Sequence, residues 1–135
     1  MPHLVILYTP NVEPQTDMTA LCRTMADVML EQRDDEGRQV FPTGGTRVLA
    51  FPAAHYAVAD SQGDYAFVYL NVRMASGRTP SVHQRVGDAL LAATKAHFAP
   101  IFDRRPIGIT LQIDESPAQV YDGKHSNLHP LFNKA

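Results

Sequence analysis

Pro2 is the residue whose type and position offer the most distinctive chemistry in this sequence. If Met1 is removed, the nitrogen of Pro2 becomes a free secondary amine on a rigid ring. A free α-amine titrates near ~7.7–8.0, and burial or neighbouring cations lower that pKa. Residues 3–9 have the composition of a β-strand, which would anchor the amine in a folded core. An anchored terminal proline could therefore act as a general base near neutral pH, although Met-Pro starts are common and most terminal prolines have no chemical role.

Other reactive residue types have simpler explanations. Cys22 lies on the apolar stripe of a predicted helix, where a small core residue is expected. His125 and His129 are four residues apart, but Pro130 argues against a regular helix that would align them as metal ligands. Gly44-Gly45 is too short for a phosphate-binding loop. We therefore predict neither a metal site nor a cofactor.

The composition excludes several classes of partner. The chain has 135 residues, which is the size of one domain, and 44% of them are hydrophobic. Its net charge is −2, from 12 basic and 14 acidic residues, so no basic footprint for nucleic acid or an anionic membrane is expected. No apolar run approaches the ~18 residues of a membrane span, and no signal peptide is evident. The lone cysteine fits a reducing cytoplasm, which is the expected location.

The hydrophobic pattern predicts strands and helices in a repeated order. In the first half we expect a strand at residues 3–9, a helix at about 14–32 and a strand at 47–51. In the second half the clearest strand is 64–74, where apolar residues alternate with aromatic and polar ones. Thr79 is a good N-cap for a helix that starts at Pro80 and that Pro100 should stop. Residues 107–114 alternate again and predict a half-buried strand.

This order indicates a single α+β domain over residues 1–135 made of two tandem β-α-β units, a pseudo-repeat of residues 2–60 and 64–115. Each unit should make a right-handed crossover between parallel strands, so that two helices cover one face of a four-stranded sheet. Apolar residues on the other face suggest subunit packing. The tail, residues 116–135, carries apolar side chains that would be costly to expose, so we expect it at a subunit interface.

Several short stretches, taken in order, resemble the 5-carboxymethyl-2-hydroxymuconate Δ-isomerase family of the tautomerase superfamily. They cover nearly the whole chain, although residues 52–58 and much of the first helix match poorly. The matching stretches are Pro2-His3, Phe41-Pro42 with Gly45-Thr46-Arg47, Asp64-Tyr65-Ala66-Phe67-Val68, Gly77-Arg78, Lys95-Ala96-His97-Phe98 and Asn127-Leu128-His129-Pro130-Leu131-Phe132. The resemblance implies a tautomerase-like homotrimer that catalyses a cofactor-free isomerisation in the meta-cleavage degradation of homoprotocatechuate.

The resemblance also implies roles for three residues, Pro2, Arg47 and Arg78. Pro2 would be the catalytic base that takes a proton and returns it elsewhere on the substrate. Arg47 and Arg78 match the two arginines of the family site and would bind substrate carboxylates. Each follows a glycine-containing loop at an element boundary, where functional residues often lie. Phe41 would give the site an apolar wall, although core packing explains it equally well.

Two alternatives remain open from the sequence. The first is a related enzyme that uses the same proline on another unsaturated keto acid, or as a dehalogenase or hydratase. The second is a non-catalytic trimeric member that binds a ligand or has a structural role. A Met1 that is retained in the native host would favour the second alternative, because Pro2 would then be an amide.

Overall fold

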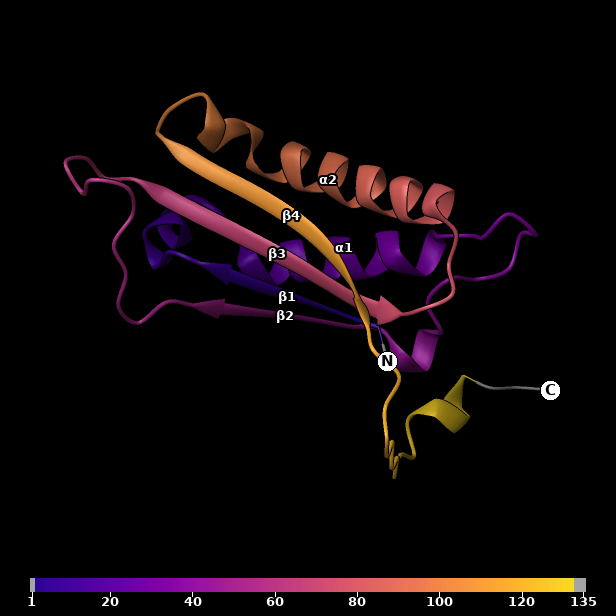
Figure 1. Ribbon diagram of the computed structural model, residues 1–135. Coiled ribbons are helices and arrows are strands. Elements are labelled where there is room, and N and C mark those ends of the chain that lie inside the picture. Colours follow the sequence, from indigo (N-terminus) through magenta and orange to yellow (C-terminus); the bar gives the residue numbers. More distant parts are fainter. Residues whose placement is uncertain (1, 133–135) are drawn as a thin grey trace.

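The four strands form one mixed sheet. The computed structural model describes residues 2–132, and its strands are β1 (His3–Tyr8), β2 (Arg47–Pro52), β3 (Ala66–Ala75) and β4 (Ile107–Ser116). Their order is β2-β1-β3-β4, with β1 parallel to β2, β3 parallel to β4, and β1 antiparallel to β3 (Figure 1). The prediction of two β-α-β units with parallel strands is therefore confirmed.

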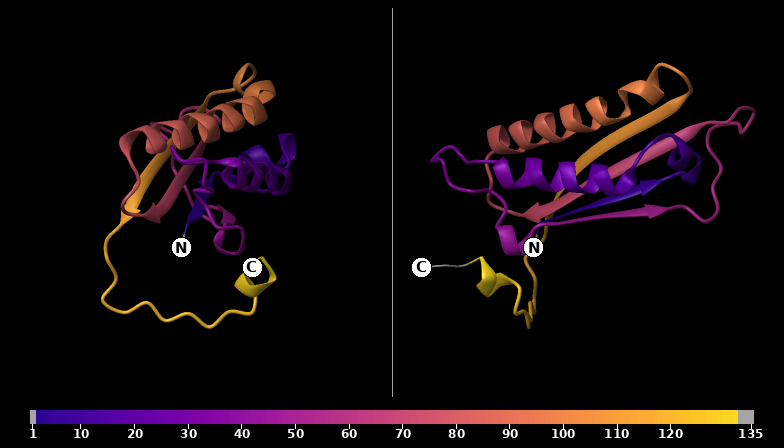
Figure 2. Two further views of the ribbon diagram at one scale, coloured as in Figure 1. Left: turned by 90° about the vertical axis from the view of Figure 1, so that its right-hand side faces the viewer. Right: turned by 180° about the vertical axis from the view of Figure 1, so that it is seen from behind.

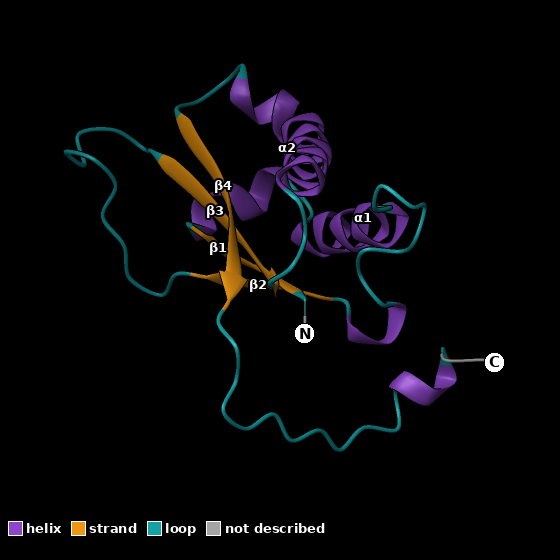
Figure 3. Ribbon diagram, turned by 45° about the vertical axis from the view of Figure 1, so that its right-hand side comes forward, coloured by secondary structure: helices purple, strands orange, loops and turns teal. Residues whose placement is uncertain are grey.

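Two helices, α1 (Met18–Glu31) and α2 (Pro80–Phe102), lie next to each other on one face of this sheet (Figure 3). The core fills the space between the two layers. Every second residue of β3 points into it, from Ala66 to Met74, as the alternation predicts. Leu21 and Met25 of α1 and Leu90 of α2 close the core from the helix side, and all three are fully buried.

The helix starts agree with local capping rules. The hydroxyl of Thr79 accepts a hydrogen bond from the backbone N–H of Val82 at 3.3 Å, and Pro80 is the first residue of α2, as predicted. The carboxylate of Asp17 caps α1 in the same way, by accepting from the N–H of Ala20 at 3.0 Å. These caps fix the residue at which each helix begins.

Two helix boundaries differ from the prediction. The segment before α1 is a separate 3-10 helix, η1 (Pro10–Gln15), and not the first turn of α1. α2 continues two residues beyond Pro100, to Phe102, although proline should have ended it. Ile101 is only 4% exposed, and we attribute the extension to the burial of this side chain, which offsets the hydrogen bond that Pro100 cannot donate.

The second face of the sheet is not covered by any helix of the described chain (Figure 1). Leu7, Leu49 and Phe51 are each 47% exposed on this open face, and Phe67 is 36% exposed. Within residues 2–132, neither helix has an apolar stretch long enough to cross a bilayer.

One end of the sheet gathers six parts of the chain. β1 and β2 begin there, and β3 and β4 end there, because His3 pairs with both Arg47 and Arg73, and Arg73 pairs with Asp114. The short helix η2 (Thr43–Gly45) leads into β2 at the same end. After β4, the chain makes a wide arc and returns with η3 (His129–Leu131) beside η2 (Figure 2).

Candidate active site

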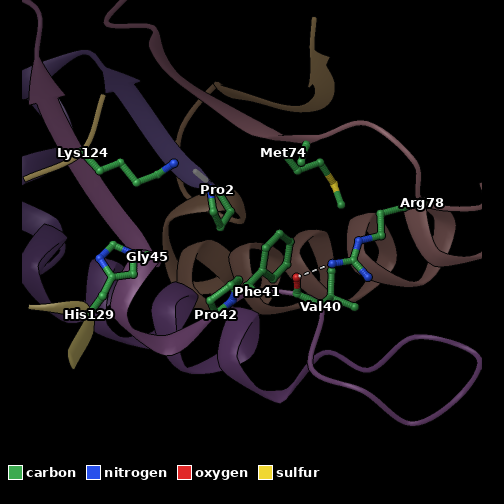
Figure 4. A pocket seen from close by; sticks show the side chains of 10 residues that line it. Pro2, Val40, Phe41, Pro42, Gly45, Met74, Arg78, Lys124 and His129 are labelled. Atoms are coloured by element: carbon green, nitrogen blue, oxygen red, sulfur yellow. Dashed lines mark hydrogen bonds between the residues drawn. The ribbon is translucent and has the colours of Figure 1, made fainter. Parts of the chain in front are cut away.

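A cavity of about 420 Å³ opens at this end of the sheet, next to Pro2. Its walls come from the start of β1, the connection between α1 and β2, the end of β3, the start of the connection to α2, and the C-terminal segment. The lining residues are Pro2, Val40, Phe41, Pro42, Gly45, Met74, Ala75, Arg78, Lys124 and His129. Pro2 and Phe41 lie in the middle of the group, with Arg78 to one side and Lys124 to the other (Figure 4). Most of this wall is apolar, so charged groups inside it are screened less than in water.

The main chain holds Pro2 in place. The next residue, His3, is already paired with β2 on one side and β3 on the other, so Pro2 is attached to an interior strand of the sheet. Leu4, which faces the same side of the sheet as Pro2, is fully buried. The predicted anchoring of this residue is therefore observed. Met1, whose removal would free the Pro2 nitrogen, lies outside the described residues.

Arg78 is held at the rim of the cavity by two acceptors. Its Nη2 donates a hydrogen bond to the carbonyl oxygen of Val40 at 3.0 Å (Figure 4). Its Nη1 lies 3.7 Å from Oδ2 of Asp34. The preceding residue, Gly77, has φ +105°, a left-handed conformation that favours glycine and sets the direction in which Arg78 leaves β3. One third of the Arg78 side chain remains exposed, which leaves part of the guanidinium accessible to a ligand.

Asp34 stabilises the loop that carries the carbonyl of Val40. Its Oδ1 accepts hydrogen bonds from the backbone N–H groups of Glu36 and Arg38, each at 2.9 Å, and Gly37 provides the positive φ of the turn. The N–H of Arg38, followed by that of Glu36 and by the nearby guanidinium groups, holds the pKa of Asp34 below its usual range, against the effect of burial. Asp34 therefore stays ionised beside Arg78 at neutral pH.

Phe41 forms the floor of the cavity and is also part of the core. Its side chain is 1% exposed, and its ring faces Pro2 between Val40 and Pro42 (Figure 4). Both explanations that the sequence allowed for Phe41, an apolar wall and core packing, therefore describe the same side chain.

Arg47 is the one predicted site residue that does not line this cavity within the described chain. In β2, Val48 and Ala50 pack on the core, so Arg47 belongs to the alternate set, with Leu49, on the open face. Its backbone still pairs with His3, the residue after Pro2, and its Nη1 donates to the carbonyl of Gly45 at 3.1 Å. The structure thus brings Pro2, Phe41 and Arg78 together around one cavity. Arg47 lies on the neighbouring strand, with its side chain on the open face of the sheet.

The comparison with protein families decides what kind of protein this is. The family model described as 5-carboxymethyl-2-hydroxymuconate isomerase matches residues 2–132. The chain belongs to this family. It is accordingly an isomerase, and the resemblance noted from the sequence motifs is confirmed.

Individual relatives agree with this assignment over the whole chain. A 5-carboxymethyl-2-hydroxymuconate Delta-isomerase of Escherichia coli is 26% identical over 132 residues, which cover 98% of this chain and 99% of that protein. A crystal structure of a 5-carboxymethyl-2-hydroxymuconate delta-isomerase is 54% identical, with a TM-score of 0.93, and covers 100% of this chain and 95% of its own. A 5-carboxymethyl-2-hydroxymuconate isomerase from Deinococcus radiodurans R1 is 33% identical with a TM-score of 0.84, covering 98% and 95% of the two chains.

Sequence reasoning missed two polar residues that line this cavity, Lys124 and His129. The spacing of His125 and His129 raised only the question of metal ligation, and Lys124 stands in no recognisable motif. The resemblance of residues 127–132 to the family was the one signal that pointed to this segment, because the segment has no periodicity that would show what it contacts.

Within residues 2–132, no group of three or more His, Cys, Asp or Glu side chains is placed to hold a metal ion. The ionisable groups of the lining are the terminal amine that Pro2 would have without Met1, a guanidinium, an ammonium and an imidazole. The last three come from Arg78, Lys124 and His129. Such a set suits proton transfer on an anionic substrate.

Proposed function

We propose that this protein catalyses the isomerisation of 5-carboxymethyl-2-hydroxymuconate, or a similar 2-hydroxy dienoate, in the catabolism of aromatic compounds. The observation that supports this most is the joint presence of Pro2, Phe41 and Arg78 around one cavity. The names of the family and of the relatives supply the substrate.

In the proposed mechanism, the unprotonated amine of Pro2 removes the proton of the 2-hydroxyl group. The electron pair of that O–H bond becomes the second bond of a C=O group, the two conjugated C=C bonds become one, and the far carbon of the diene takes the proton from the prolinium. The products are a 2-oxo compound and the regenerated amine, so no cofactor is needed. A rigid ring on an anchored strand keeps the lone pair in a fixed direction during both transfers.

The proposed substrate-binding groups are the guanidinium groups and Phe41. Arg78 binds a substrate carboxylate through charge-assisted hydrogen bonds, and its positive charge also lowers the pKa of Pro2. Phe41 excludes water from the reacting atoms. Arg47 acts as the second guanidinium; it extends from the strand next to Pro2 and completes the site when subunits assemble on the open face.

We also propose a homotrimer, supported by the exposed apolar side chains of the open face, Leu7, Leu49 and Phe51. The tail, residues 116–135, contributes to the interface through residues such as Val120 and Tyr121, which are 107% and 87% exposed in the single chain. A set of exposed apolar side chains of this extent is typical of subunit contacts. The unpaired thiol of Cys22 supports a cytoplasmic location.

The state of the Pro2 nitrogen gives the direct test of this mechanism. Protein with a free Pro2, verified by the mass of the N-terminal peptide, is compared with protein that retains Met1 and with Pro2→Ala. We expect ultraviolet-monitored ketonisation to fall by about 10²- to 10⁴-fold in both altered proteins, because a positioned base contributes a factor of this size. Circular dichroism and sedimentation should show an unchanged fold and assembly. Full activity of Pro2→Ala, or of the form that retains Met1, would refute the mechanism.

A further inference from the structure

The wall of the cavity opposite Arg78 comes from outside both β-α-β units. Lys124 and His129 belong to residues 117–132, the segment that follows β4. In Figure 4 the ammonium of Lys124 extends toward Pro2, and the ring of His129 lies beside Gly45. The C-terminal segment therefore adds a positive charge to the side of Pro2 that no arginine among residues 2–132 lines.

This segment is fixed on the body of the protein at one place. The hydroxyl oxygen of Ser126 accepts hydrogen bonds from the N–H groups of Leu128 and His129, at 3.1 and 3.4 Å, and lies 3.2 Å from Nδ1 of His129. The turn so formed packs on η2. A Cβ atom added to Gly44 would lie 3.0 Å from the Cα of His129, so a glycine is what permits this close approach.

Lys124 has a nearby counter-ion but remains accessible. Its Nζ lies 2.6 Å from Oδ2 of Asp122, and its side chain is 49% exposed. This pair lowers the pKa of Asp122, so the carboxylate is charged at neutral pH. A carboxylate that enters the cavity would meet the same ammonium group, which has three donors and can pair with two anions at once.

The charge of the proposed substrate calls for such a group. A muconate has a carboxylate at each end, and the carboxymethyl substituent adds a third. Arg78 and Arg47 account for two of them in the proposed function. We propose that Lys124 binds the third carboxylate and makes the enzyme prefer tricarboxylates to dicarboxylates, with His129 acting as a positioning residue that holds the segment on η2. This inference rests on the proposed function for the identity of the substrate.

The kinetic test compares two substrates. 5-Carboxymethyl-2-hydroxymuconate has three carboxylates, and 2-hydroxymuconate lacks the carboxymethyl arm. In Lys124→Met, the ratio of kcat/KM for the first substrate to that for the second should fall about ten-fold, the loss expected when one exposed charge-assisted bond disappears. Lys124→Arg should keep most of the preference. Lys95→Met, which removes a lysine that lines a separate hollow on α2, should leave the ratio unchanged.

A binding test separates this inference from the proposed function. Calorimetry compares tricarballylate with glutarate, which has the same three-carbon spacer but no central carboxylate. We expect the wild-type protein to bind tricarballylate more tightly, and we expect Lys124→Met, and Gly44→Ala by displacing His129, to reduce that preference. An equal preference in wild-type protein and Lys124→Met overturns the inference. Wild-type protein that binds these ligands but ketonises neither muconate overturns the proposed function alone.

Discussion

Replacing Arg78 with alanine should separate its role in binding from its role in folding. The variant loses the bond between the guanidinium and a substrate carboxylate. A charge-assisted hydrogen bond contributes about 1.5–3 kcal/mol. Because one third of the side chain is exposed, water screens the pair and we expect the lower part of this range. The predicted effect is a rise in KM of about 10- to 30-fold, with a smaller change in kcat.

The same substitution also removes a structural contact. The Nη2 of Arg78 donates to the carbonyl of Val40 at 3.0 Å, and Val40 itself is 3% exposed. Loss of this bond should lower the free energy of unfolding by about 0.5–1.5 kcal/mol. Arg78→Lys keeps the charge but not the paired donors, so its KM should lie between those of the wild-type protein and Arg78→Ala.

The assay is ultraviolet-monitored ketonisation at varied substrate concentration, together with urea unfolding of each variant. Arg38→Ala is the matched control, because Arg38 lies on the loop before Val40, is 76% exposed and pairs with Glu36 at 3.2 Å. It should leave KM unchanged. A folded Arg78→Ala protein whose KM for a di- or tricarboxylate equals that of the wild type would show that Arg78 does not bind substrate.

Two further predictions concern stability and assembly. Burial lowers the pKa of His97 in the folded protein, although the charge of Asp17 opposes this shift. The neutral His97 therefore contributes to stability above about pH 6.5, and this contribution is lost as the pH falls through the lowered folded-state pKa. His97→Gln should therefore show a smaller loss of unfolding free energy between pH 7.5 and pH 5 in urea titrations, and an unchanged pH dependence would contradict this. Phe51→Glu places a charge on the open face and should give folded monomers in sedimentation experiments, whereas Leu91→Glu on α2 should not. A trimer that persists in Phe51→Glu would exclude the open face from the interface.

Local patterns were enough to predict the scaffold of the site. The alternation in residues 64–74 and the Thr79-Pro80 pair predicted β3 and the start of α2, because side-chain period and capping depend on neighbours in the chain. The order of the elements also predicted that each crossover joins two parallel strands, as β1 and β2 and then β3 and β4 do. The family could also be recognised from its motifs alone.

The contents of the cavity depended on contacts between distant segments. The sequence places Arg47 next to a glycine loop, but only the packing of Val48 and Ala50 on the core shows that it faces away from the cavity that Arg78 lines. Lys124 and His129 reach this cavity through a segment without periodic pattern, whose path is set by the packing of η3 on η2. Sequence determines which side chains share a face of one element. Which faces meet is decided by packing, because burial acts between elements that are far apart in the chain.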